Sequence, residues 1–152
     1  MGSTNQHVLF TLDEQRYSLP LVDVEKVVSA VYITPLPLAP DIVTGIIDVH
    51  GQVVPVINLR RRFHLPERTL ELTDQFIIAH TSRRTVALTV DMVSGVIDIP
   101  QRAIVHRTDI LPSIEHVAGV VTQEDGVLLI HDLEACLSFD EERALETALR
   151  AA

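Results

Sequence analysis

Short runs of apolar residues alternate with polar turns along most of the chain. Strand-sized apolar runs occupy residues 8–10, 53–57, 76–78, 86–90 and 127–130. Polar or glycine-containing segments separate most of these runs. Runs of this length between turn residues are typical of β-strands, so the pattern predicts many short strands.

The choice of apolar residues supports the same prediction. The chain contains 20 valines and 13 isoleucines, whereas aromatic residues make up 4% of it and tryptophan is absent. β-branched side chains pack well on a pleated sheet and lose rotamer freedom in a helix. We therefore expect a mainly β fold.

The chain also contains an internal repeat. Residues 8–28 align without a gap with residues 76–96, and residues 45–59 align in the same way with residues 119–133. Two β-rich halves can also match in apolar pattern alone, which is the alternative explanation. Because two separate blocks match in the same order, we favour an internal duplication.

Each half predicts a small set of short strands. Closing such a set into a barrel hides edge strands that otherwise pair with other chains. We therefore expect one domain, residues 1–152, whose approximate halves at 7–67 and 75–138 form two small β-barrels. An exchange of terminal strands between the two halves is compatible with this division.

Helix-start signals follow the strands. Ser138 with Glu141 three residues later is a capping box, and two leucines then fall on one helical stripe, which predicts a C-terminal helix at residues 139–150. Asn58 and Asp132 stand after the last strand of each half. Both are N-cap candidates for a short helix.

The charge balance limits the kinds of partner. Twelve basic and twenty-one acidic residues give a formal net charge of -9, which repels nucleic acid and anionic membrane surfaces. The single cysteine, Cys136, excludes an internal disulfide, and no apolar run approaches the roughly 20 residues of a membrane-spanning helix. We expect a cytoplasmic protein that binds no nucleic acid and does not insert into a membrane.

Sequence patterns of catalytic chemistry are missing. The seven histidines form no metal-binding spacing, and there is no nucleophile elbow, phosphate-binding loop or dinucleotide fingerprint. We therefore predict no enzyme activity, no catalytic residue, no metal site and no cofactor. A basic run at residues 60–62 is unusual because it opens an expected helix, where the helix dipole favours acidic residues.

One segment resembles a known signature. Residues 45–60, G-I-I-D-V-H-G-Q-V-V-P-V-I-N-L-R, are similar to the pattern G-x-x-N-L-R-G-x-x-V-P-V-x-D-L-R of the CheW family of chemotaxis coupling proteins. Residues 8–12, 87–96 and 117–134 add to the resemblance, which extends from about residue 7 to the C-terminal helix. It implies two SH3-like five-stranded β subdomains around a shared core.

The resemblance also implies a function and two binding surfaces. The function is that of a non-enzymatic adaptor that joins the cytoplasmic tip of a chemoreceptor to the regulatory domain of a CheA-type histidine kinase, within receptor arrays. The kinase-binding residues it implies are Val22, Val24, Lys26 and Val27. The receptor-binding residues it implies are Asp48, Val49, His50, Gly51, Arg60 and Val90.

Both surfaces depart from the family pattern. His50 stands where the family has arginine, so a permanent cation with a five-donor fork is replaced by a side chain that is mostly neutral at pH 7. Asp48 and Val49 replace asparagine and leucine, and Lys26, the only lysine, stands where an acidic residue is common.

Two alternatives stay open at the level of sequence. A divergent member of the family can lose kinase or receptor coupling and recruit a different partner. From another class of protein, a small-ligand-binding or catalytic β-barrel is also possible. A deep pocket with convergent polar groups is the feature that favours the ligand-binding class.

Overall fold

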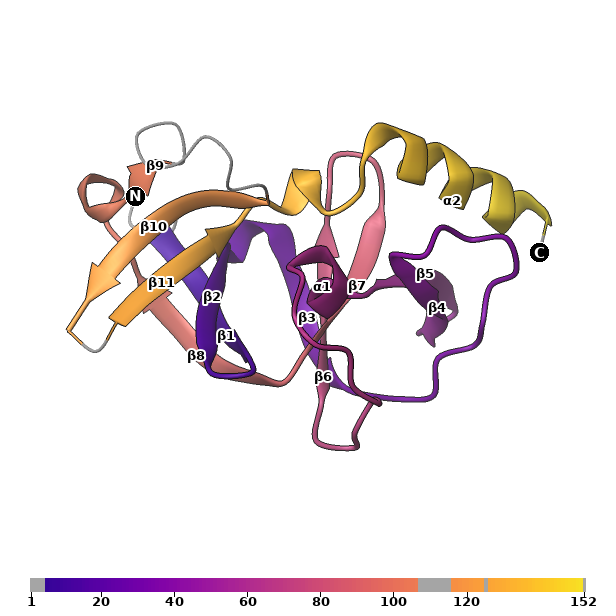
Figure 1. Ribbon diagram of the computed structural model, residues 1–152, viewed down its shortest axis with the longest axis horizontal. Coiled ribbons are helices and arrows are strands. Elements are labelled where there is room, and N and C mark those ends of the chain that lie inside the picture. Colours follow the sequence, from indigo (N-terminus) through magenta and orange to yellow (C-terminus); the bar gives the residue numbers. More distant parts are fainter. Residues whose placement is uncertain (1–4, 107–115, 125, 152) are drawn as a thin grey trace.

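The chain forms two β-sheets side by side, with one longer helix along the edge of the second sheet (Figure 1). The computed structural model describes residues 5–106, 116–124 and 126–151. The strands are β1 (Gln6–Leu12), β2 (Gln15–Pro20), β3 (Val24–Ser29), β4 (Val43–Val49), β5 (Gln52–Ile57), β6 (Gln75–His80), β7 (Thr85–Val90), β8 (Met92–Asp98), β9 (Val105–His106), β10 (Val117–Gln123) and β11 (Gly126–His131). The helices are α1 (Leu59–Arg62) and α2 (Phe139–Ala151), with 3₁₀ turns η2 (Leu21–Asp23), η3 (Gln101–Ala103) and η5 (Leu133–Ala135).

The sheets contain six and five strands. The six-stranded sheet has the order β8-β1-β2-β11-β10-β9, and the five-stranded sheet has the order β3-β6-β7-β5-β4. The predicted mainly β fold with two SH3-like subdomains and a C-terminal helix is confirmed. The six-stranded sheet differs from the expected five strands by β9, which is only two residues long.

The two sheets repeat one arrangement of strands. Matching β3, β6, β7, β5 and β4 with β8, β1, β2, β11 and β10 makes the two orders identical. Each sheet has one parallel pair, β5 with β7 and β11 with β2. A bulge interrupts β4 before Gly45 and β10 before Gly119, at matching positions of the repeat. The sheets therefore follow the internal repeat of the sequence.

The N-terminal hairpin and the hairpin of the second half are exchanged between the sheets. Strands β1 and β2 pair with β8 and β11, while β6 and β7 pair with β3 and β5. Each sheet therefore contains strands from both residues 7–67 and residues 75–138. The two ranges are interlocked in space rather than lying side by side.

The largest hydrophobic cluster lies between the sheets. Phe10 and Leu19 enter it from the six-stranded sheet, Ile77 and Leu88 from the five-stranded sheet, and Leu145 from α2. Each sheet also encloses a smaller cluster of its own. Burying one such large side chain contributes roughly 1.5 to 3 kcal/mol, so the shared cluster is the main force that holds the two sheets together.

Two matching glycines allow the chain to approach the sheets closely. A Cβ atom on Gly45 would overlap the carbonyl oxygen of Thr34, and one on Gly119 would lie 2.7 Å from Cγ2 of Ile104. In both sheets the segment that crosses the glycine precedes the strand that contains it, β4 or β10. The position needs glycine for space, because neither residue has a positive φ.

Helix α2 begins as the sequence predicts. The Ser138 amide donates to Oε1 of Glu141 over 2.8 Å, and the Glu141 amide donates to Oγ of Ser138 over 3.1 Å, which completes the capping box. The helix buries Leu145 and Ala148 against the shared core. Figure 1 shows it running along the side of the five-stranded sheet that carries α1.

The two shorter cap predictions had different outcomes. Asn58 caps α1, because its side chain accepts a hydrogen bond from the Arg61 amide over 3.0 Å. Asp132 makes no side-chain cap hydrogen bond, and the segment after it is a three-residue 3₁₀ turn rather than an α-helix. The prediction for Asp132 was wrong, since a turn of this length leaves few unpaired amides for a cap.

Candidate functional site

The β3 edge, defined as residues 22–27, is one exposed candidate surface. Strand β3 ends the order of the five-stranded sheet, so it pairs only with β6. Val22 stands in η2 directly before the strand, with 83% of its surface exposed. Val24 and Val27 are partly buried and pack against the shared core. The edge therefore offers unpaired backbone groups beside an exposed apolar side chain.

Lys26 on this edge has an acidic neighbour. Its ammonium nitrogen lies 3.7 Å from a carboxylate oxygen of Glu25. The other oxygen of Glu25 lies 2.9 Å from Nε2 of His80 on β6. Glu25 therefore offsets part of the positive charge that Lys26 brings to the edge, a detail that the resemblance does not reveal.

The β4–β5 turn, residues 48–51, is the second exposed surface. His50 and Gly51 both have positive φ, at 50° and 86°. This is the backbone of a two-residue type I′ hairpin, which twists as the flanking strands do. Asp48 and His50 are exposed, whereas Val49 is partly buried against the core of the five-stranded sheet.

The structure separates the implied receptor-binding residues into two groups. Arg60 lies beyond the opposite end of β5 from the turn, and six strand residues span roughly 20 Å. Its residue exposure is 9%, and Val90 is completely buried in the shared core. The turn residues thus face solvent, whereas the Arg60 and Val90 side chains lie inside the protein.

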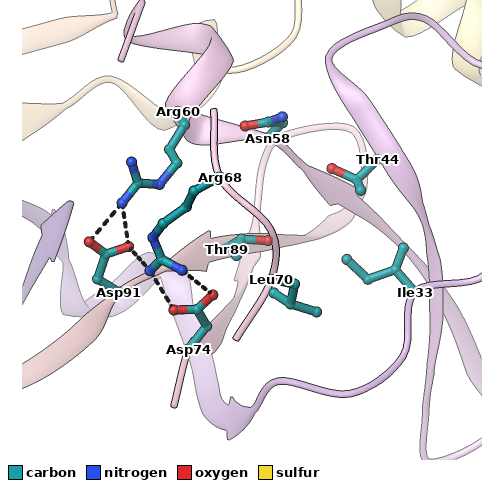
Figure 2. A pocket seen from close by; sticks show the side chains of 9 residues that line it. All are labelled: Ile33, Thr44, Asn58, Arg60, Arg68, Leu70, Asp74, Thr89 and Asp91. Atoms are coloured by element: carbon teal, nitrogen blue, oxygen red, sulfur yellow. Dashed lines mark hydrogen bonds and ion pairs between the residues drawn. The ribbon is translucent and has the colours of Figure 1, made fainter. Parts of the chain in front are cut away.

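Arg60 belongs to a group of ion pairs that we call the clamp, formed by Arg60, Asp91, Asp13, Arg68 and Asp74. One terminal nitrogen of Arg60 donates to both oxygens of Asp91 at 2.9 Å and lies 2.8 Å from Asp13. Arg68 binds the same Asp91 at 2.7 Å and Asp74 at 2.6 Å (Figure 2). Asp13 belongs to the β1–β2 turn, so the clamp connects the six-stranded sheet to the end of the five-stranded one.

The electrostatics of the clamp follow from these contacts. Burial alone lowers the pKa of the Arg60 guanidinium, but hydrogen bonds to Asp91 and Asp13 outweigh burial and leave that pKa raised. Burial raises the pKa of Asp91, but hydrogen bonds from Arg60, the Asp13 amide and Arg68 leave it lowered. The charged forms of both partners are therefore favoured at neutral pH.

The basic run at residues 60–62 is not an open positive patch. Arg61 pairs with Glu67 at 3.3 Å, and Arg62 pairs with Glu141 of α2 at 2.6 Å. With Arg60 in the clamp, all three arginines have acidic partners. Their position at a helix start is explained by contacts with distant segments rather than by the helix itself.

The hollow beside the clamp is small, and its charged side chains are paired with one another. Its volume is about 90 Å³, whereas ligand pockets usually measure roughly 300 to 1,000 Å³. Its charged side chains, Arg60, Arg68, Asp74 and Asp91, neutralise one another (Figure 2). The arrangement locks segments together and leaves no free acid or base pointing at a substrate.

Two further groups of side chains in the described part of the chain are the cysteine and the metal-binding residue types. Burial raises the pKa of the Cys136 thiol to about 12, so it stays protonated and weakly nucleophilic near neutral pH. No three histidine, cysteine or acidic side chains gather as metal ligands in the ranges that the structure describes. Across those same residues, no helix combines the length and apolarity needed to cross a membrane.

Four of the five members of the clamp were not found from the sequence. Asp13 and Asp91 look like ordinary turn residues, and Arg68 and Asp74 lie in a long connection with no periodic pattern. The only available signal was the odd placement of Arg60 at a helix start. It indicated a missing partner without identifying one.

Comparisons with known proteins agree with the architecture. The profile of the CheW-like domain family matches residues 6–141. The chemotaxis protein CheW of Treponema pallidum is 31% identical over 146 residues, which cover 92% of this chain and 86% of that protein. Protein FrzA of Myxococcus xanthus is 29% identical over 119 residues, covering 74% and 71%. The crystal structure of the scaffolding protein TtCheW from Thermoanaerobacter tengcongensis superposes with a TM-score of 0.81 at 30% identity, covering 91% of this chain and 95% of that one.

Proposed function

Because the chain belongs to the CheW-like domain family, we propose that it is a chemotaxis adaptor that couples chemoreceptors to a CheA-type histidine kinase. The main support is the family match over residues 6–141. The structurally similar TtCheW is described as a scaffolding protein, and a scaffold works through surfaces rather than reactive groups. A ligand-binding or catalytic barrel is not favoured, because the polar groups beside the clamp neutralise one another.

We assign the kinase contact to the β3 edge. A partner strand or loop placed there meets unpaired backbone groups and the exposed Val22, with Val24 and Val27 set behind it. Lys26 adds a charge that is partly offset by Glu25. Interfaces of this kind depend on a few apolar anchors, with rim charges setting fidelity more than affinity.

We assign the receptor contact to the β4–β5 turn. Asp48 and His50 project from a rigid two-residue hairpin, and Val49 anchors it in the sheet. With histidine in place of arginine, the turn lacks a bidentate partner for a receptor carboxylate. Arg60 and Val90 support the contact from inside: Arg60 fixes the segment that follows β5, and Val90 fills the core.

The cellular setting follows from the proposed coupling. We propose a cytoplasmic location at receptor arrays, with the kinase regulatory domain and the receptor tip as the two partners. The acidic chain gives no reason to expect nucleic acid as a partner, since like charges repel.

Co-sedimentation with receptor and kinase fragments, each alone and both together, tests the proposal. We expect capture by each fragment at low salt. Capture of neither would reject the coupling function, and capture of only one would identify a divergent member that has lost the other partner. Exposed ion pairs contribute only about 0.2 to 1 kcal/mol, so moderate salt should weaken binding without abolishing it.

Two substitutions examine the assigned surfaces separately. His50→Arg should strengthen receptor binding by up to about fivefold, because it restores a permanent cation at the turn. Lys26→Glu should strengthen kinase binding by a similar factor if the partner residue is basic. Arg102→Glu on η3 is the control that should change neither affinity. No effect of His50→Arg at pH 7.5, with both proteins folded, would show that the turn does not face the receptor.

A further inference from the structure

An exposed aromatic ring lies between two arginines at the start of α2. Phe139 is the first residue of the helix and 63% of its surface is exposed. The guanidinium carbons of Arg83 and Arg143 lie 5.6 Å and 5.8 Å from the centre of its ring. Arg83 comes from the β6–β7 turn, which Figure 1 shows beside the beginning of α2. We call these three residues the Arg–Phe–Arg patch.

The two arginines differ from their neighbours because they carry unneutralised charge. Neither Arg83 nor Arg143 forms an ion pair with a carboxylate of the described residues, and both are exposed. The adjacent Arg84, by contrast, binds Glu142 at 2.5 Å and Glu146 at 2.7 Å. On a chain of net charge -9, Arg83 and Arg143 are two exposed cations without an anionic partner among the described residues.

Two of the neighbouring carboxylates, Glu134 and Glu142, are already hydrogen-bonded. Glu134 accepts hydrogen bonds from the amide and the hydroxyl of Ser82, at 2.8 Å and 2.7 Å. Glu142 is held by Arg84. Asp140 follows Phe139 in the helix but makes no ion pair within the described chain. The guanidiniums of the patch are therefore available to a carboxylate from outside, and arginine forms bidentate pairs with this group.

A cavity continues the patch into the protein. It measures about 280 Å³ and lies between the β6–β7 turn and the start of α2. The hydroxyl-bearing residues Thr81, Ser82 and Ser138 line it together with Leu137 and Phe139, and Glu134 and Glu142 also line it, so the carboxylates of a ligand stay at the mouth near Arg83. A cavity of this size accommodates one or two side chains but not a large cofactor.

We propose that the Arg–Phe–Arg patch and its cavity form a docking surface for an acidic peptide segment of a partner protein. Carboxylates of the segment pair with Arg83 and with Arg143, and a neighbouring apolar side chain packs against Phe139 at the cavity mouth. The surface uses residues other than those of the β3 edge and the β4–β5 turn, so it goes beyond the proposed coupling function. It adjoins the β3 edge, because Asp23 of η2 lies near enough to Glu134 for their charges to interact.

The surrounding charge selects a short segment over an extended polyanion. Asp140, Glu141, Glu142 and Glu146 lie on the same helix, so a membrane surface or nucleic acid would bring phosphates toward these carboxylates. A peptide that presents one or two carboxylates at the patch avoids them. Such steering is a local effect, since charges are screened beyond about 8 Å at physiological salt.

A nuclear magnetic resonance titration of the intact protein tests the docking surface. The probe is a capped hexapeptide with two glutamates next to one phenylalanine and otherwise neutral residues, and its matched control has glutamine in place of both glutamates. At about 50 mM salt, where screening is modest, we expect amide shifts concentrated at residues 81–84 and 138–144. We expect the glutamine peptide to bind at least about tenfold more weakly, because it lacks the carboxylates.

Charge-reversal variants of the two arginines provide a second test of the docking surface. The double variant Arg83→Glu and Arg143→Glu should weaken binding of the acidic peptide at least about tenfold, whereas Arg102→Glu, an exposed arginine on η3, should leave it unchanged. Thermal unfolding of each variant establishes that the fold is intact. Phe139→Ser should weaken binding without changing its salt dependence.

Three outcomes would overturn the proposal. They are no localised shifts at millimolar peptide, equal binding of the glutamine peptide, and unchanged binding by the charge-reversed variant. Co-sedimentation with phosphatidylserine vesicles that depends on Arg83 and Arg143 would assign the patch to a membrane instead. The same variants are measured against receptor and kinase fragments, so failure of peptide docking is distinguishable from failure of the coupling function.

Discussion

The two sheets share one strand order, but the segments that follow their last strands have diverged. After β5, Asn58 caps α1, and the side chain of Arg60 in that helix belongs to the clamp. After β11, Asp132 caps nothing and η5 leads on toward α2. The pairing register, the bulge and the close-packed glycine are the same in both sheets.

This difference shows which parts of a duplicated fold are constrained. A shift in register would turn the buried face of a strand to solvent, so both copies keep the register. The segments outside the sheets carry no such constraint, and each has acquired its own contacts. The matching aspartates illustrate this point: the pKa of Asp91 is lowered within the clamp, whereas burial and then Glu134 raise the pKa of Asp23.

Among the substitutions that distinguish the two regions, removing the clamp should cause the largest loss of stability. Arg60→Ala removes one of the two cations that bind Asp91 and the ion pair to Asp13, while Arg68 stays in place. Breaking a buried pair costs about 3 to 5 kcal/mol, and the remaining contact with Arg68 puts the expected cost at the lower end. We expect the free energy of unfolding, measured by urea denaturation at pH 7, to fall by about 3 kcal/mol. Arg61→Ala, on the same helix but exposed, should cost less than about 1 kcal/mol. Equal losses for the two variants would contradict a special role for the clamp.

The six-stranded sheet contains a buried histidine that should make the stability of the protein depend on pH, and the five-stranded sheet has isoleucine at the matching position. His131 is 1% exposed and occupies the position that Ile57 holds in the repeat. Burial lowers its pKa to about 4, and its Nε2 has no hydrogen-bond partner among the described residues. Because the unfolded chain takes up a proton near pH 6.5 and the folded one does not, stability should fall as the pH drops from 6.5 to 4, by up to about 3 kcal/mol.

The matching residue provides the test of this pH effect. His131→Ile should flatten the pH dependence of unfolding free energy between pH 6.5 and 4, while the carbonyl of His116 keeps its hydrogen bond from the Asp132 amide. His50→Asn, at an exposed turn, serves as the control and should keep the slope of the unaltered protein. A slope that survives His131→Ile would mean that other groups cause it.

The two matching glycines should respond unequally to alanine. In Gly45→Ala the new methyl group meets the backbone oxygen of Thr34, which cannot move without shifting the chain. In Gly119→Ala it lies 2.7 Å from a side-chain atom of Ile104, and the backbone oxygen of Val105 is farther away at 3.2 Å, so the clash is milder. Overpacking costs about 1 to 3 kcal/mol, so we expect a loss near the upper end at Gly45 and near the lower end at Gly119 in thermal unfolding. A larger loss at Gly119 than at Gly45 would show that the atoms nearest each glycine do not determine the cost of crowding.

The caps should give the smallest difference. Asn58→Ala removes the hydrogen bond to the Arg61 amide, and losing a cap costs about 1 kcal/mol. Asp132→Ala removes no cap bond, so its free energy of unfolding, measured in urea, should stay within about 0.5 kcal/mol of that of the unaltered protein. A loss at Asp132 as large as that at Asn58 would indicate a contact outside the turn.

Local features of the fold were predictable, and its long-range partners were not. Alternation along β1, the turn at His50 and the capping box at Ser138 each depend on residues close in sequence. The exchange of hairpins cannot be predicted from local sequence, because the apolar pattern of β2 is equally compatible with any neighbouring strand. Only the resemblance to a known family indicated two sheets around a shared core.

The candidate surfaces show the same limit. The β3 edge and the β4–β5 turn were located from family motifs, and their exposure became clear only in three dimensions. The burial of Val90 was not foreseen, since a valine at a strand end reads equally well as core or surface. Ion pairs such as Arg60 with Asp13 join residues far apart in the chain, and no periodic signal marks them.

The exchanged hairpins also govern how the protein is made. Arg16 on β2 pairs with Leu128 on β11, so the N-terminal hairpin leaves the ribosome roughly a hundred residues before its neighbour. At usual rates of translation this interval is on the order of ten seconds, far longer than a hairpin needs to form. During that time the apolar face of β1 has no permanent cover, and the nascent polypeptide depends on transient shielding until its last strands arrive.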